Sequence, residues 1–339
     1  METGRFKVVA INPHPELEFG YEQEALGPLG VEIERVMTTD RETVRAAARD
    51  ADVVIPMRFR LDRELIGELT RCRLIPSGGI GVDHIDVTAA TEQGILVTNM
   101  ADTFVEEVAN HAWMLLLMVA RRGRWLHDMT LEQRWGEVHE QLFPILRVSM
   151  PRITGQTLGL ISFGRIARAV ARRAQAFGMA VVAYDPYVPE AVFEEAGAEP
   201  ASLAEVCRRS DFVSCHLPLS EETHHLVGEE QFRLMKPSAI FISTGRGPVV
   251  DEAALIAALA EVRLAGAGLD VFEREPLAAD SPLLRMPNVT LSPHIASVSD
   301  VSAVERKRLM GRQIADALQG KIPKGVVNPT VVATWEWKE

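Results

Sequence analysis

The sequence predicts an α/β protein built from two doubly wound parallel-sheet domains. Short runs of β-branched and other apolar residues alternate with helical segments before about residue 100, and the alternation restarts at residue 157. Such alternation is typical of parallel sheets that helices cover on both faces. The length of 339 residues also favours two domains over one.

The first alternation begins with a β-rich stretch at residues 6–12. Asp40 is a plausible N-cap for one of the helices that follow. In order, we expect a helix at 21–27, a strand at 31–36, a helix at 40–50, a strand at 51–57, a helix at 62–69, and strands at 73–78 and 95–99.

A long helix is expected at residues 104–121, followed by a region without a clean period. The helix has too few apolar residues to span a bilayer and ends in arginines, so we interpret it as a buried helix. Residues 123–156 predict a helix and then an irregular connection. The domain boundary is expected near residues 100–105.

The second alternation predicts a larger sheet. Its expected strands are 157–162, 180–185, 212–217, 238–244, 265–271 and 288–293, and its expected helices are 165–177, 189–196, 202–208, 229–234 and 252–261. A last amphipathic helix at about 300–319 can belong to either domain.

Composition excludes several function classes. The net charge is −11, with acids and bases mixed along the chain, which argues against a nucleic-acid or anionic-membrane surface. The three cysteines lack metal-binding spacing and predict reduced thiols in a cytoplasmic protein without a metal site: Cys72, Cys207 and Cys215. The N-terminal stretch lacks the apolar core of a signal peptide.

The stretch TLGLISFGRIARAVARRAQAFG at 157–178 has the strand–turn–helix form of a dinucleotide-binding turn. Gly164 lies where a backbone without Cβ can approach a pyrophosphate at a helix N-terminus. Asp185 follows 21 residues later at the end of the next strand, where an acid binds ribose hydroxyls. No basic residue follows it closely, which favours NAD over NADP.

The fingerprint is incomplete, because Ser162 replaces its first glycine and Ala167 its third. Alanine is tolerated at the last position. If the first position needs a positive φ, serine costs about 1 kcal/mol relative to glycine. Taken alone, this pattern is weak, and an ordinary strand-to-helix connection remains an alternative.

Three polar residues follow later strands of the same expected sheet. They are Arg246, an acid of the run EREP (273–276) and His294, at the carboxyl ends where ligands bind in open α/β sheets. Arginine can hold a carboxylate with two hydrogen bonds, and histidine can exchange a proton near neutral pH. Glu275 can orient the histidine, although Glu273 in the same run is a rival. Together with a nicotinamide, this set suits reduction of a 2-oxo acid.

In their order along the chain, the motifs resemble the D-isomer-specific 2-hydroxyacid dehydrogenase family. This family includes glyoxylate/hydroxypyruvate reductases, phosphoglycerate dehydrogenase and D-lactate dehydrogenase. The resemblance covers about residues 51–329 through SGGIGVDHID (77–86), GILVTN (94–99), LGLISFGRIARAVA (158–171), AYDP (183–186), HLPL (216–219), GRGPVVDE (245–252), AGLDVFEREP (267–276) and SPHIAS (292–297).

The resemblance implies that one domain binds the cofactor and the other binds the substrate. Residues 103–296 would form a Rossmann NAD-binding domain, and residues 1–102 with 297–339 a flavodoxin-like substrate-binding domain. A cleft between them would close over the substrate. Members of the family are commonly dimers built around the long helix, so a homodimer is expected.

The resemblance also implies roles for individual residues. The catalytic residues would be Arg246, Glu275 and His294, with Asp270 on the nicotinamide carboxamide. The cofactor-binding residues would be Gly164, Arg165, Ile166, Asp185, Pro218, Thr244, Gly245 and Asp270. The substrate carboxylate would bind to the N–H groups of Gly79, Ile80 and Gly81. Arg58 lies in the substrate-selecting loop, where a substrate contact and a solvated arginine are equally open.

Two other functions remain open from the sequence. One is an NAD-sensing binding protein related to the corepressors that share this fold, although the chain shows no disordered tails or basic patches. The other is a related NAD enzyme acting on formate or a phosphonate. The pairing of His294 with Glu275 argues against formate oxidation, which needs no proton donor.

Overall fold

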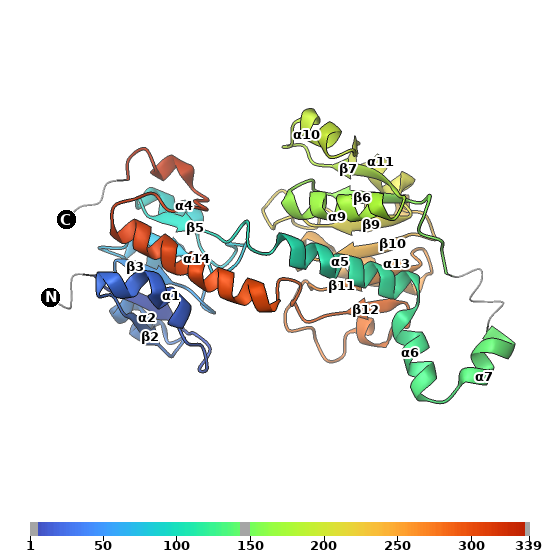
Figure 1. Cartoon of the computed structure of the whole chain (residues 1–339), viewed down its shortest axis with the longest axis horizontal. Helices are drawn as coiled ribbons and strands as arrows, with labels where there is room; N and C mark the ends of the chain where they lie inside the picture. The colour runs from blue at the N-terminus through green and yellow to red at the C-terminus, as the bar shows by residue number, and fades with distance from the viewer. Residues whose placement is uncertain (1–5, 143–149, 336–339) are drawn as a thin grey trace. The chain divides into compact units, whose positions relative to one another are not determined.

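The computed structural model describes residues 6–142 and 150–335 (Figure 1). The chain divides into two compact units. Residues 1–104 and 298–339 form the first unit, and residues 105–297 form the second. The C-terminal helix α14 (Asp300–Leu318), whose domain the sequence left open, belongs to the first unit.

The first unit contains a five-stranded parallel sheet in the order β2-β1-β3-β4-β5. This is the strand order of flavodoxin-like sheets. The strands are β1 (Val8–Ile11), β2 (Ile33–Val36), β3 (Val53–Ile55), β4 (Leu74–Pro76) and β5 (Leu96–Thr98). The helices besides α14 are α1 (Gly20–Leu26), α2 (Arg41–Ala48), α3 (Arg63–Gly67) and α4 (Val87–Glu92), with a 3-10 turn at Gly27–Leu29 and another at Pro329–Val331.

Aspartate caps start three of these helices. The side chains of Asp40, Asp62 and Asp86 accept hydrogen bonds from backbone N–H groups in the first turns of α2, α3 and α4. Such caps satisfy N–H groups that have no partner within the helix. Helix α4 was not expected from the sequence because it is too short to show a period, and its cap was its only signal.

The second unit contains a seven-stranded parallel sheet in the order β12-β11-β10-β9-β6-β7-β8. Its strands are β6 (Thr157–Ile161), β7 (Ala180–Tyr184), β8 (Glu199–Pro200), β9 (Phe212–Cys215), β10 (Ile240–Ser243), β11 (Gly266–Leu269) and β12 (Val289–Leu291). The chain order reverses between β6 and β9, as in a Rossmann sheet, and ligands bind at that point.

The helices of this unit include the long buried helix that the sequence predicted, α5 (Val105–Ala120). The others are α6 (Gly123–Leu131), α7 (Trp135–Glu137), α9 (Arg165–Ala176), α10 (Glu190–Glu195), α11 (Leu203–Arg209), α12 (Glu229–Leu234) and α13 (Glu252–Ala260), with 3-10 turns at Gly247–Val249 and Pro282–Arg285 and a π-helical turn at Val138–Leu142. Part of the predicted irregular connection, residues 143–149, lies outside the described residues.

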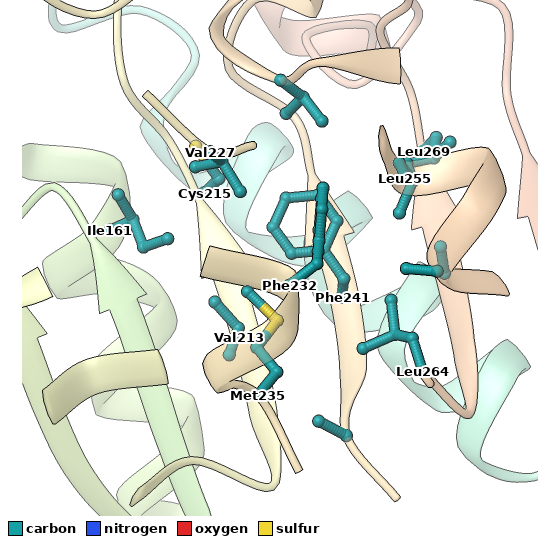
Figure 2. Close-up of a cluster of buried hydrophobic side chains, with 14 of the residues drawn as sticks. Ile161, Val213, Cys215, Val227, Phe232, Met235, Phe241, Leu255, Leu264 and Leu269 are labelled. Carbon is teal, nitrogen blue, oxygen red and sulfur yellow. The ribbon is translucent and has the colours of Figure 1, made fainter. Parts of the chain in front are cut away.

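Hydrophobic side chains cover both faces of the second sheet. On one face, Val213 and Phe241 pack against Phe232 of α12 and Leu255 of α13 (Figure 2). On the other face, strand residues pack against α5 and α9. Neighbouring residues of a strand point to opposite faces, so both faces need apolar residues. The prediction of two parallel-sheet α/β domains is therefore confirmed.

Among the described residues, no helix is both long enough and apolar enough to cross a membrane. Helix α5, which the sequence indicated to be too poor in apolar residues to span a bilayer, is among the helices described.

Candidate active site

The turn after β6 has the backbone conformation that the missing glycine would supply. Ser162 has φ of +87°, in the left-handed region that favours glycine. Its N–H donates to the carbonyl of Tyr184 at 2.8 Å. Its Oγ accepts a hydrogen bond from the N–H of Gly164 at 3.4 Å. The serine is therefore accommodated by a bond within the turn.

Gly164 is the N-cap of α9, with Arg165 and Ile166 in its first turn. This places three predicted cofactor residues at a helix N-terminus, where free N–H groups and the helix dipole favour anions. Asp185 follows β7, and its Oδ2 accepts the N–H of Phe163 at 2.8 Å. The acid and the turn are thus joined directly, which suits a dinucleotide across β6 and β7.

His216 follows β9 and is buried between two hydroxyl groups. Its Nε2 lies 2.9 Å from Ser214 Oγ, and its Nδ1 lies 2.9 Å from Thr244 Oγ1. Burial lowers the pKa of His216 to about 4, so the imidazole is neutral at physiological pH. His216 is therefore suited to a supporting role rather than to acid/base chemistry. Its contact with Thr244 stabilises the end of β10, which Thr244 and Gly245 follow.

Pro218 also lies beyond the end of β9. Its carbonyl accepts a hydrogen bond from Thr223 Oγ1 at 2.7 Å. The loop that follows β9 is therefore held in a turn at the point where the sheet order reverses.

His294 and Glu275 form a close pair. His294 Nδ1 lies 2.7 Å from Glu275 Oε2, and Glu275 Oε1 accepts the N–H of Phe272 at 3.1 Å. The bond to Glu275 raises the pKa of His294, although burial and Arg246 oppose this. Burial would raise the pKa of Glu275, but the bonds from His294 and Phe272 bring it below its ordinary value. The pair can therefore hold a proton on the histidine.

The rival carboxylate is paired elsewhere. Glu273 Oε1 lies 2.9 Å from His225 Nε2, and Glu273 Oε2 accepts the N–H of Glu252. The structure therefore separates two glutamates that are only two positions apart in the sequence.

Arg246 follows β10 and is held near the pair by a very close backbone approach. A Cβ on Gly247 would lie 1.6 Å from the carbonyl oxygen of Phe272, so only glycine fits there. Arg246 Nη1 also donates to the carbonyl of Gly245 at 2.9 Å. Arg246 acts electrostatically on both His294 and Glu275. The second unit therefore brings all three predicted catalytic residues together.

Asp270 follows β11 and is buried, with 1% of its side chain exposed. Its oxygens accept hydrogen bonds from Ser292 Oγ at 2.6 Å and from the N–H groups of Ile295 and Ala296. Burial alone would raise the pKa of Asp270, but these bonds and one from His111 bring it below its ordinary value. Asp270 therefore holds residues 292–296, the segment that contains His294, by hydrogen bonds on both sides of this histidine.

Sequence reasoning missed His111 and Ser292. His111 Nε2 lies 2.7 Å from Ser292 Oγ and 3.4 Å from Asp270 Oδ1. The available signal was a lone histidine in the apolar helix α5.

The predicted substrate residues lie in the first unit, after β4. The carbonyls of Gly79, Ile80 and Gly81 accept hydrogen bonds from Met100 N–H, Asn99 Nδ2 and Ser77 Oγ, respectively. Gly79 N–H makes a long bond of 3.4 Å to Ser77 Oγ. Within residues 6–142 and 150–335, the N–H groups of Ile80 and Gly81 have no hydrogen-bond partner. Such a loop can receive an anion.

Arg58 follows β3, the neighbour of β4, and is exposed. Its Nε and Nη2 donate long hydrogen bonds to the carbonyls of Asn12 and Pro13, at 3.3 and 3.4 Å. It therefore lies at the same edge of this sheet as the 79–81 loop.

The described residues contain no group of histidine, cysteine and acidic side chains that could hold a metal ion. Burial raises the pKa of the Cys72 and Cys207 thiols to about 12 and that of Cys215 to about 11. These thiols are protonated and unsuited to binding metal.

Comparison with known proteins shows the family of this chain. Residues 113–296 match the model of the D-isomer specific 2-hydroxyacid dehydrogenase NAD-binding domain. A glyoxylate reductase from Korarchaeum cryptofilum is 38% identical over 323 residues, covering 95% of this chain and 92% of the relative.

Solved structures share the whole fold. The D-lactate dehydrogenase of Aquifex aeolicus, solved with NAD and lactic acid, has a TM-score of 0.81 and 28% identity, covering 97% of this chain and 98% of that one. The NADPH-dependent glyoxylate/hydroxypyruvate reductase of Sinorhizobium meliloti, solved with NADP and malonate, has a TM-score of 0.84 and 29% identity, covering 98% and 99%.

Fold and site together define an oxidoreductase that uses a nicotinamide dinucleotide, NAD or NADP. The chain belongs to the D-isomer specific 2-hydroxyacid dehydrogenase family.

Proposed function

We propose that this enzyme is an NAD-dependent dehydrogenase that interconverts a 2-oxo acid and a D-2-hydroxy acid. The observation that carries the proposal is the 2.7 Å contact between His294 and Glu275, with Arg246 acting on both. The pair provides a proton donor, and the arginine provides a fixed positive charge for a carboxylate.

In the direction of reduction, NADH supplies a hydride to C2 of the 2-oxo acid. Arg246 binds the carboxylate and the carbonyl oxygen, which gains negative charge. Nδ1 of His294 donates to Glu275, and because this bond raises the pKa of His294, the ring can carry a second proton on Nε2, which neutralises the new alkoxide. The oxidation direction reverses this, and neutral His294 accepts the hydroxyl proton.

We propose NAD rather than NADP as the cofactor. Gly164, Arg165 and Ile166 would hold the pyrophosphate, and Asp185 the adenosine ribose. Pro218, Thr244, Gly245 and Asp270 would line the rest of the dinucleotide site. A 2′-phosphate would meet the carboxylate of Asp185 and, beyond it, Glu222, which accepts the hydroxyl hydrogen of Tyr187. Two carboxylates oppose a phosphate electrostatically.

We propose that residues 1–102 and 297–339 bind the substrate and that residues 103–296 bind the cofactor. The N–H groups of Ile80 and Gly81, with Gly79, would hold the substrate carboxylate, and Arg58 would contact the substrate. A small 2-oxo acid such as glyoxylate is the proposed substrate, because the similar K. cryptofilum protein is a glyoxylate reductase.

We also propose a cytoplasmic homodimer built around α5. Trp135 in the segment after α5 exposes 64% of its surface and Leu131 exposes 68%, which is unusual for such large apolar side chains.

The test is NADH absorbance with a panel of glyoxylate, hydroxypyruvate, pyruvate and phenylpyruvate. We expect turnover with at least one of them, and loss of most of it in His294→Ala and Arg246→Ala. His225→Ala is the control, since His225 also pairs with a glutamate, Glu273, through its Nε2, but lies outside the proposed site. No turnover across the panel, or full turnover in His294→Ala, would overturn the proposal.

A further inference from the structure

Helix α5 packs along strand β11 with a regular spacing of contacts. A Cβ on Gly266 would lie 2.7 Å from Val119, and a Cβ on Gly268 would lie 2.8 Å from Leu115. The next pair along is His111 and Asp270, whose Nε2 and Oδ1 are 3.4 Å apart.

The register of these pairs has a simple cause. Four helical residues rise about 6.0 Å, and two strand residues about 6.6 Å. An antiparallel helix can therefore match every fourth residue to every second strand residue. Because both glycines lack side chains, helix α5 lies close to strand β11 (Figure 1). The contact with Asp270 places His111 at the carboxyl end of the strand.

The hydrogen bonds determine which nitrogen of His111 carries a proton. Ser292 Oγ has one hydrogen, and its 2.6 Å contact with Asp270 Oδ1 requires that hydrogen, because the carboxylate is ionised. The 2.7 Å contact between Ser292 Oγ and His111 Nε2 must then be a bond that the histidine donates. His111 Nε2 therefore carries a hydrogen.

This chain of bonds ends on the segment that carries His294. Asp270 accepts the N–H groups of Ile295 and Ala296 at 3.0 and 2.9 Å, and its own carbonyl accepts the N–H of His294 at 2.8 Å. His294 has φ of +52°, which is unfavourable for a residue other than glycine. The surrounding bonds must hold that conformation.

We propose that His111 is a positioning residue for the proton-transfer step, acting through Ser292 and Asp270 on the segment that holds His294. This inference rests on the role proposed above for His294. As the Nε2–H tautomer, His111 keeps Ser292 oriented as a donor to Asp270. Removing the donor lets Ser292 rotate, so Asp270 loses a partner and His294 loses its fixed position.

The test compares two substitutions of His111. His111→Gln places an amide N–H near the position of Nε2 and should keep kcat within about twofold of the wild type. His111→Leu keeps the apolar bulk without a donor and should lower kcat about tenfold, a change typical of losing one bond to a charged group. Its thermal midpoint and NADH dissociation constant, measured by fluorescence, should stay close to those of His111→Gln.

A double-mutant cycle tests the path through Ser292. In a Ser292→Ala background, His111→Leu should cause a smaller loss of kcat than in the wild type, because the connecting hydroxyl is already absent and only the 3.4 Å contact with Asp270 remains. In the free enzyme, 15N NMR of the imidazole should show hydrogen on Nε2 of His111.

Two kinetic results would overturn the inference: an equal loss of kcat in His111→Gln and His111→Leu, or wild-type kcat in His111→Leu. Two further results would do the same: independent losses of kcat that multiply in the double-mutant cycle, or a hydrogen on Nδ1 only of the His111 ring. A failure of the proposed function looks different, because His294→Ala would then keep its turnover. Activity that depends on His294 but not on His111 contradicts this inference alone.

Discussion

Glu275 Oε2 lies 2.7 Å from Nδ1 of His294, while Glu273, two residues earlier, pairs with His225 at 2.9 Å. The chain therefore contains two similar carboxylate–imidazole pairs. The first has Arg246 among the charges that act on it and lies on the segment that Asp270 holds by hydrogen bonds. These features support the proton-transfer role proposed for His294, and the second pair provides a control for it.

Glu275→Gln should move the pH dependence of reduction to lower pH. Reduction needs protonated His294, so the rate falls as pH rises through the pKa of this histidine. The carboxylate raises that pKa, and a neutral amide removes the effect. At neutral pH, we expect kcat to fall at least about tenfold. Initial rates from pH 5 to 9 check this, and Glu273→Gln should leave the midpoint of the profile in place.

Ser162→Gly should stabilise the second unit. The φ of +87° costs serine about 1 kcal/mol relative to glycine, which exceeds the gain from its long bond to Gly164. Ser162→Ala keeps the strain and loses the bond, so it should be less stable than the wild type. Denaturant unfolding of the three proteins measures both effects.

The same two variants test the effect of Ser162 on the cofactor. Both free the N–H of Gly164, which Ser162 Oγ otherwise occupies, for a phosphate oxygen. We expect both to bind NADH severalfold more tightly in a fluorescence titration. Weaker binding by both would mean that the hydroxyl itself contacts the cofactor.

Glu222→Gln should weaken discrimination against NADPH. Tyr187 links Glu222 to Asp185, the residue proposed to bind the adenosine ribose. The hydroxyl of Tyr187 donates to Glu222, and its N–H donates to Asp185 at 3.1 Å. Removing one negative charge should raise the ratio of kcat/KM for NADPH to that for NADH severalfold. Glu221→Gln changes the same net charge one position away and should leave the ratio nearly constant.

Glu22→Gln should stabilise the first unit at neutral pH. Glu22 on α1 is only 2% exposed, and its Oε2 has no hydrogen-bond partner among the described residues. Burial raises its pKa, although Lys307 and Arg306 oppose this. Glu22 therefore binds its proton more tightly in the folded state than in the unfolded state. The stability of the protein falls as the pH rises from the pKa of Glu22 in the unfolded chain to its higher pKa in the folded chain.

The glutamine stays neutral and avoids this loss, so we expect a gain of about 1 kcal/mol at pH 7 in unfolding experiments. The gain should shrink at acidic pH, where Glu22 is protonated. Glu24→Gln is the control, because Glu24 is exposed and pairs with Arg308. A gain in that variant, or none in Glu22→Gln, would contradict the explanation by burial.

The sequence by itself determined the α/β class, the two sheets and two of the proposed catalytic residues, Arg246 and His294. Strand and helix periods depend on local apolar patterns, and a parallel sheet gathers the carboxyl ends of its strands at one edge. That is why Arg246 and His294 were predictable from their positions after strands, while the preference for Glu275 over Glu273 came from the family resemblance. Asp40 likewise marks the start of α2 through a purely local bond.

Only the tertiary structure decided which glutamate meets His294, how Ser162 fits its turn, and that His111 joins the site. The first and the last depend on contacts between residues far apart in the chain: Glu275 and His294 are 19 positions apart, and His111 and Ser292 are 181. Local periodicity cannot encode such distances. The glycines of β11 decide how closely α5 approaches, and that approach brings a helix residue to the far end of a strand.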